Sequence, residues 1–150
     1  MATTDDRLHR LEAIAVIKEL TAKYCMHVSR KEGEAIVDLF IDDGVLDGST
    51  AAIGVTSGRD ALLAFYKQSV TDGEESLPFI HSHIIQVSGD EAPGTRALEA
   101  RFSRGGRSIT AAGFHQDTYR RVDGRWLFAE RKLHFHHVVP LGKGWAETQH

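Results

Sequence analysis

The order of the helix-like and strand-like segments constrains the fold of this chain more than any other feature. Three segments with helical periodicity come first, at residues 5–30, 34–41 and 58–70. A short strand is expected between them, at Val45–Asp47. Four strand-like segments follow, at residues 77–88, 94–104, 107–122 and 125–137. This order indicates an α+β fold with an antiparallel meander, because a doubly wound parallel sheet requires helices and strands to alternate.

Length and composition favour one domain that spans residues 1–150 and needs no covalent cross-link. The lone Cys25 excludes an intramolecular disulfide framework and is expected to be a small packing residue. The net charge of −3 and the lack of a basic cluster argue against nucleic acid as a partner. No apolar run approaches the roughly 20 residues of a membrane span, and the polar start does not resemble a signal peptide. Cytoplasmic localisation is therefore expected.

Histidine is over-represented, with nine copies in the chain. Alternation along the strands predicts which of them share a face. On the segment 77–88, one face is expected to carry Leu77, Phe79, His81, His83, Ile85 and Val87. On the segment 107–122, the residues expected to share a face are Ala111, Gly113, His115, Asp117 and Tyr119. On the segment 125–137, they are Leu127, Ala129, Arg131, Leu133 and Phe135. The group His134, His136 and His137 is expected at a strand end or a subunit contact.

Several stretches of sequence resemble a known family when they are taken in order. They are LFIDDGVLDG (39–48), GRDALLAFY (58–66), VSGDEAPG (87–94) and GFHQDTYRRVDGRWLFAER (113–131). With the long opening helix, they are similar to the SnoaL-like members of the nuclear transport factor 2-like superfamily. The resemblance implies a cone-shaped, curved antiparallel sheet (a cystatin-like α+β barrel) closed by three helices. It also implies a homodimer or homotrimer.

The catalytic members nearest in pattern are scytalone dehydratase and γ-hexachlorocyclohexane dehydrochlorinase, which use an Asp–His pair in a cofactor-free elimination. Carried over onto this chain, the family Asp falls on Ser29 and the family His on Leu77. His81 stands four residues after Leu77 on the same expected face. The resemblance also makes His115 a pocket-lining residue and matches Arg131 to the pocket arginine of the dehydrochlorinase.

These expectations predict a site inside the cone that needs no cofactor and no metal. The catalytic candidates are His81 and His115, because a neutral imidazole in an apolar pocket can exchange protons with a carbon acid or a leaving hydroxyl. An arginine there can stabilise an oxyanion. The residues expected to bind the substrate are Tyr24, Ser29, Phe79, His83, Arg131 and Phe135. The predicted activity is that of a lyase or isomerase, of the dehydratase or cyclase type, acting on a small apolar cyclic molecule.

Three alternatives remain open from the sequence. The loss of the family Asp at Ser29 is also compatible with a non-catalytic pocket protein that binds a small molecule. His81, His83 and His115 could instead form a three-nitrogen metal site of the catalytic zinc type. Finally, Arg131 could form an ordinary structural ion pair, either with a neighbour of Glu130 or with Asp117. Because Ile80 and Ile84 make the opposite face of the 77–88 strand apolar too, the inward face of that strand could be the other one.

Overall fold

The computed structural model of the protein describes residues 1–148 and contains one curved sheet with its helices. The helices are α1 (Thr4–Ser29), α2 (Gly33–Val37) and α3 (Arg59–Tyr66). The strands are β1 (Phe40–Gly48), β2 (Gly54–Ser57), β3 (Ser76–Ile85), β4 (Glu91–Arg104), β5 (Arg107–Val122) and β6 (Arg125–Pro140). Short 3-10 turns at Ser49–Ala51 and Trp145–Thr148 and a wide π-type turn at Lys67–Thr71 complete the chain.

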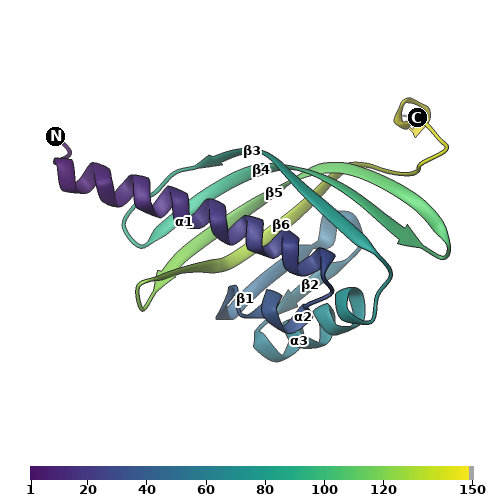
Figure 1. The fold of residues 1–150 in the computed structure, drawn as a ribbon, viewed down its shortest axis with the longest axis horizontal. Helices are drawn as coiled ribbons and strands as arrows, with labels where there is room; N and C mark the ends of the chain where they lie inside the picture. Colours follow the sequence, from purple (N-terminus) through teal and green to yellow (C-terminus); the bar gives the residue numbers. More distant parts are fainter. Residues whose placement is uncertain (149–150) are drawn as a thin grey trace.

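The six strands lie in the order β2-β1-β6-β5-β4-β3, which confirms the predicted α+β class with its antiparallel meander. Every neighbouring pair is antiparallel except β1 and β6, which run parallel. Figure 1 shows α1 crossing the strands, with α2 and α3 below them beside β1 and β2. We call the sheet face that packs against α1 the inner face and the opposite one the outer face.

Two-residue turns join β4 to β5 and β5 to β6, at a Gly-Gly and an Asp-Gly pair whose position between strand-like segments predicts hairpins from the sequence. In the β5–β6 turn both Asp123 (φ 50°) and Gly124 (φ 77°) have positive φ, which is the type I′ geometry that matches the twist of a hairpin. Gly105 and Gly106 form the same kind of turn between β4 and β5, with φ of 57° and 74°. These turns set the register of the meander, so that residues of β4, β5 and β6 lie in rows across the sheet.

Residues 34–57 differ from the prediction. The helix expected at 34–41 ends at Val37, and Phe40 begins a strand that runs to Gly48, much longer than the expected Val45–Asp47. The strand β2 was not predicted. β1 forms because Phe40 pairs with Phe128 in β6, far along the chain, and a pairing of such long range leaves no local periodicity in the sequence.

The helix α1 buries its C-terminal half and leaves its start exposed. Apolar residues recur at steps of three and four along this segment, which predicts one apolar stripe. The stripe residues Ile17, Leu20, Tyr24 and Val28 are buried. Leu11, on the same stripe, is 63% exposed, because the first part of α1 extends beyond the strands (Figure 1). Thr4 and Asp5 are the capping residues that the sequence predicts for this helix, but in the structure the cap is Thr3. Its side chain accepts a hydrogen bond from the Asp6 amide, and the Asp6 carboxylate accepts one from the Thr3 amide.

Bulges in β3 and β6 change which side chains face inward. In β3, His81 lies opposite Ala97 and His83 opposite Arg96, so Ser82 (φ 26°) is an extra residue. The prediction that His81 and His83 share a face is therefore wrong: Phe79 and His81 point outward and His83 inward. In β6, Ala129 is the extra residue between Phe128 and Glu130, so Phe128 replaces Ala129 on the inner face, whereas Arg131, Leu133 and Phe135 keep their predicted side.

No helix among residues 1–148 is long and apolar enough to cross a membrane.

The β5–β6 register can be tested at Gly113. A Cβ atom at this position would lie 1.9 Å from the carbonyl oxygen of His134, because the two backbones approach closely beside the irregularity at His136. We expect Gly113→Ala to lower the free energy of unfolding by about 2 kcal/mol or more, since the strands must separate to admit a methyl group. Gly142→Ala, where nothing lies within 4 Å, is the control and should change stability by less than about 0.5 kcal/mol. Urea denaturation measures both; a stable Gly113→Ala protein would contradict this register.

Candidate active site

Polar side chains gather on the inner face, where the core is otherwise apolar. Two adjacent rows of the sheet carry them. One row contains His83, Arg96, His115 and Leu133, on β3, β4, β5 and β6 in turn. The next row contains Ile85, Gly94, Asp117 and Arg131 on the same four strands. Arg96, His115, Asp117 and Arg131 are all buried, which marks them out because charged groups are rarely buried without a partner.

Asp117 is the centre of this polar cluster. Its two carboxylate oxygens accept hydrogen bonds from Nε and Nη2 of Arg131, both at 3.0 Å. Oδ2 also accepts a hydrogen bond from the Tyr119 hydroxyl at 2.9 Å, and Nε of Arg96 lies 3.6 Å from it. Because both partners are fully buried, this bidentate pair is a structural ion pair of the kind left open by the sequence.

A hydrogen-bonded chain links Asp117 to a histidine. The Tyr119 hydroxyl donates its single proton to Asp117, so its oxygen accepts a hydrogen bond from Nε2 of His83 at 3.0 Å. This assignment leaves the Nδ1 lone pair of His83 free of the chain. Gly94 makes the arrangement sterically feasible, since a Cβ there would lie 2.7 Å from the Tyr119 ring.

The surroundings of the cluster keep its histidines neutral. Burial, together with the positive charge of Arg96, lowers the pKa of His83 to about 4. Burial and the charges of Arg131 and Arg96 also lower the pKa of His115 well below its usual range. Burial and the adjacent Asp117 raise the pKa of Tyr119, which therefore stays protonated. At neutral pH the histidines can accept protons but carry no charge.

The two arginines differ in how well they are paired. Arg131 also lies against two aromatic rings, with its guanidinium carbon 4.2 Å from the centroid of Tyr24 and 4.3 Å from that of Phe128. Although burial opposes it, the Asp117 charge raises the pKa of Arg131. Burial and repulsion from Arg131 lower the pKa of Arg96. The closest hydrogen-bond acceptor of Arg96 is the Thr21 carbonyl oxygen, 3.5 Å from its Nη1.

The structure brings five of the eight predicted site residues to the inner side of the sheet. Tyr24, His83, His115, Arg131 and Phe135 lie there. The Tyr24 hydroxyl, however, is 3.0 Å from the Tyr66 hydroxyl, so it bonds within the core. Ser29 donates its hydroxyl proton to the Met26 carbonyl of its own helix, 2.9 Å away.

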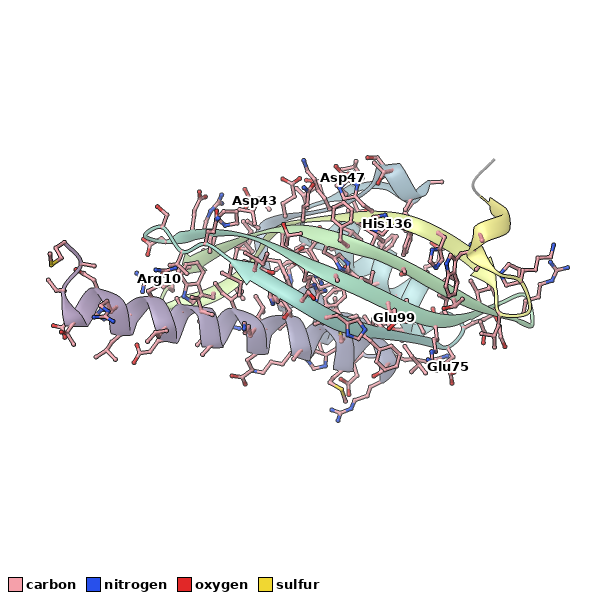
Figure 2. The ribbon with its side chains drawn as sticks, turned by 90° about the horizontal axis from the view of Figure 1, so that it is seen from above. Arg10, Asp43, Asp47, Glu75, Glu99 and His136 are labelled. Carbon is pink, nitrogen blue, oxygen red and sulfur yellow. The ribbon has the colours of Figure 1, made fainter. Side chains whose placement is uncertain are left out.

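His81 and Phe79 lie on the outer face, away from the cluster. His81 is exposed, with its Nε2 2.8 Å from the Glu99 carboxylate, and Phe79 lies near Arg101. Figure 2 looks onto the sheet from this side and shows Glu99 and His136 along its strands. The expectation that both residues line the cone is therefore wrong, because the bulge at Ser82 reverses the alternation of β3.

The three-histidine metal site is not formed. Among residues 1–148, no three His, Cys, Asp or Glu side chains lie close enough together to hold a metal ion. His81 is on the outer face, whereas His83 and His115 are on the inner face, on strands separated by β4. The two histidines that remain together have a guanidinium between them in the same row, which would repel a cation.

Sequence reasoning missed Arg96 and the role of Tyr119. Alternation within β4 would have found Arg96. Every second position of this strand carries a small or apolar residue, and Arg96 stands in the same series, on the buried side: Ala92, Gly94, Leu98 and Ala100. Two hollows lie elsewhere on the molecule, and the first of them has Asp117 among its lining residues. One of about 340 Å³ lies on the outer face beside Gln116 and Lys132, and another of about 690 Å³ lies between α2 and α3.

Comparison with known proteins agrees with this fold. The family model of the SnoaL-like domain matches residues 9–132, and the chain belongs to this family, within the nuclear transport factor 2-like superfamily. A comparison with curated proteins finds no match.

Three solved structures illustrate the likeness. Hexachlorocyclohexane dehydrochlorinase LinA-type3 from Novosphingobium barchaimii is 21% identical, with a TM-score of 0.80 over 92% of this chain and 96% of that one. A protein of Novosphingobium aromaticivorans assigned as a scytalone dehydratase is 21% identical, with a TM-score of 0.77 over 90% and 97%. A Nostoc punctiforme protein with a cystatin-like fold is 24% identical, with a TM-score of 0.64 over 89% and 92%. At these identities the likeness establishes the fold.

Asp117 should be far more important for stability than Arg96. We expect Asp117→Asn to lower the free energy of unfolding by about 3 to 5 kcal/mol, because two buried cations lose their counter-charge. Arg96→Met should change it by less than about 1 kcal/mol or increase it, since one matched ion pair remains. Asp90→Asn, which removes a surface partner of Arg121, is the control and should cost at most about 1 kcal/mol. Equal losses for Asp117→Asn and Asp90→Asn in urea denaturation would contradict the central role of Asp117.

The buried histidine should make stability depend on pH. The pKa of His115 is lower in the folded protein than in the unfolded chain, where it is about 6.5. Below about pH 6.5 the unfolded chain therefore binds a proton that the folded protein does not, and the free energy of unfolding must fall as pH falls. We expect His115→Gln to reduce this slope between about pH 6.5 and 5 relative to the unaltered protein. Denaturation at a series of pH values measures it, and identical slopes for the two proteins would refute the assignment.

Proposed function

We propose that this protein is a cofactor-independent lyase or isomerase that acts by histidine acid–base chemistry on a small, mainly apolar cyclic molecule at the inner face. The observation that carries the proposal is the chain from His83 through Tyr119 to Asp117, which holds an uncharged, half-buried imidazole in one orientation. The membership of a family whose relatives include dehydratases and dehydrochlorinases supports it.

The proposed base is His83, with its Nδ1 lone pair as the acceptor. It would take a proton from a carbon next to a carbonyl group, and the C–H electron pair would move to the carbonyl oxygen as an enolate. Elimination then follows when that electron pair returns and expels a leaving group on the next carbon. The imidazolium gives its proton to a departing hydroxide, forming water, so that no oxidant or cofactor enters the balance.

The arginines would stabilise the charge that develops in this step. Nη1 of Arg131 is buried and lacks a hydrogen-bond partner, so it is a donor for the oxyanion, while Arg96, directly opposite His83 in the register, adds its positive charge. Fixed donors in a buried site stabilise an oxyanion without reorganisation. His115, next in the same row, stays in the proposed site as a neutral positioning residue beside Arg96. The resemblance further supports a homodimer or homotrimer, which stays a prediction.

Proton exchange in D₂O tests the activity. The protein is incubated with cyclic ketones that carry a β-hydroxyl or β-halogen substituent, and proton NMR follows loss of the α-proton and formation of the unsaturated product. We expect His83→Ala to slow the reaction by roughly 10²- to 10⁴-fold. The rate should rise with pH through about 4, as His83 loses its proton, and level off near neutrality.

The matched control is His81→Ala, two residues away on the opposite face of the same strand. It should retain the activity of the unaltered protein. Equal losses in His81→Ala and His83→Ala, or no loss in either, would reject His83 as the base.

A non-catalytic binding protein is the second candidate. It is favoured by Ser29, whose hydroxyl is bonded within α1 and so cannot replace the family carboxylate. This candidate predicts saturable binding of a ketone from the panel with no exchange above the buffer rate.

A further inference from the structure

The charges of the polar cluster do not balance. Arg96 and Arg131 contribute two positive charges, and Asp117 contributes one negative charge. His83 and His115 are neutral and Tyr119 is protonated at neutral pH. Among residues 1–148, Asp117 is the only carboxylate that forms an ion pair or a hydrogen bond with either arginine. The cluster therefore has one excess positive charge in the protein interior, where an unmatched charge is costly.

Its unused hydrogen-bonding atoms are all nitrogens. Within the described residues 1–148, four buried side-chain atoms have no hydrogen-bond partner: Nε and Nη2 of Arg96, Nη1 of Arg131 and Nδ1 of His115. The three guanidinium atoms can only donate. Arg131 uses its own Nε and Nη2 to hold both oxygens of Asp117. On Arg96, neither nitrogen of the same edge has a hydrogen-bond partner, although Nε lies 3.6 Å from Oδ2 of Asp117; such an edge suits a carboxylate.

The neighbourhood of Arg96 favours an anion over water. The charge of Lys18 in α1 contributes to the lowered pKa of His83, so it adds positive potential to this row. His83 is half-buried, whereas Arg96, directly opposite it, is buried. A ligand would therefore approach Arg96 from the side of His83. Leu98, Ile80 and Phe135 of the inner face provide apolar contact for the body of a ligand beside these donors.

From the charge count and the free donors together, we propose that the cluster binds a small organic monoanion through its carboxylate, held by the Nε/Nη2 edge of Arg96. This rests on the proposed function and narrows its substrate class to an apolar cyclic acid. One missing negative charge matches a carboxylate, whereas a phosphate would bring nearly two. The planar guanidinium also fits two carboxylate oxygens at once.

Binding of benzoate against benzamide tests the proposal on the unaltered protein. The two probes have the same ring and nearly the same shape, but only benzoate is charged. In chloride-free buffer, we expect calorimetry to show benzoate binding at least roughly 10-fold more tightly than benzamide, the effect of one charge-assisted hydrogen bond. Benzoate should also raise the melting temperature, because it binds the folded state. Equal affinities for the two probes, or no binding of benzoate, would overturn the proposal.

The variants locate the site. Arg96→Gln should weaken benzoate binding by roughly 10- to 100-fold while benzamide binding stays unchanged. Arg101→Gln, an exposed arginine of the same strand that lies over Phe79 on the outer face, is the matched control and should bind benzoate normally. Undiminished binding by Arg96→Gln, or an equal loss in Arg101→Gln, would overturn the assignment to Arg96. So would chloride binding as tightly as benzoate and displacing it, because a halide needs no carboxylate-shaped edge.

These results can be separated from those on catalysis. Benzoate binding requires no turnover, so binding without proton exchange would reject the proposed activity and keep the anion site. Proton exchange that depends on His83, without any preference for benzoate over benzamide, would keep the proposed activity and reject the anion site.

Discussion

The ion pair between Asp117 and Arg131 is the interaction on which the inner face depends. It joins β5 to β6 through two fully buried side chains, and it orders the groups around it. Asp117 also accepts a hydrogen bond from the Tyr119 hydroxyl. The Tyr119 oxygen can therefore only accept a hydrogen bond from His83, so Nε2 of His83 carries the proton of that bond. One buried carboxylate thus sets both the stability of the sheet and the orientation of the proposed base.

The same carboxylate also explains why the cluster is incomplete. Asp117 gives both oxygens to Arg131 and Tyr119, and Nε of Arg96 remains 3.6 Å away, without a hydrogen bond. A fold held only by structural ion pairs would be expected to match its buried charges, since each unmatched one costs stability. The second arginine is therefore better explained by a ligand than by the fold. The large loss of stability expected for Asp117→Asn, against the small change expected for Arg96→Met, expresses this difference.

Part of the candidate site could be read from strand alternation. On β5, alternation correctly placed His115, Asp117 and Tyr119 on one face, because that strand is regular where they lie. The same rule failed on β3, where the bulge at Ser82 reverses it and moves His81 outward. Arg96 was accessible to the same reasoning on β4. The chain from His83 to Asp117 was not, because it joins residues 34 positions apart whose distance depends on the pairing of three strands.

Local chemistry in the chain was sufficient to predict the α+β class, the long first helix and the two-residue turns. Those features depend on side-chain periodicity and on residues that tolerate positive φ, both of which act over a few positions. The parallel pairing of β1 with β6, the extra residue in β3 and the excess charge around Asp117 required the folded structure. Each of them is a relation between distant segments, and a one-residue change in register alters which side chains meet.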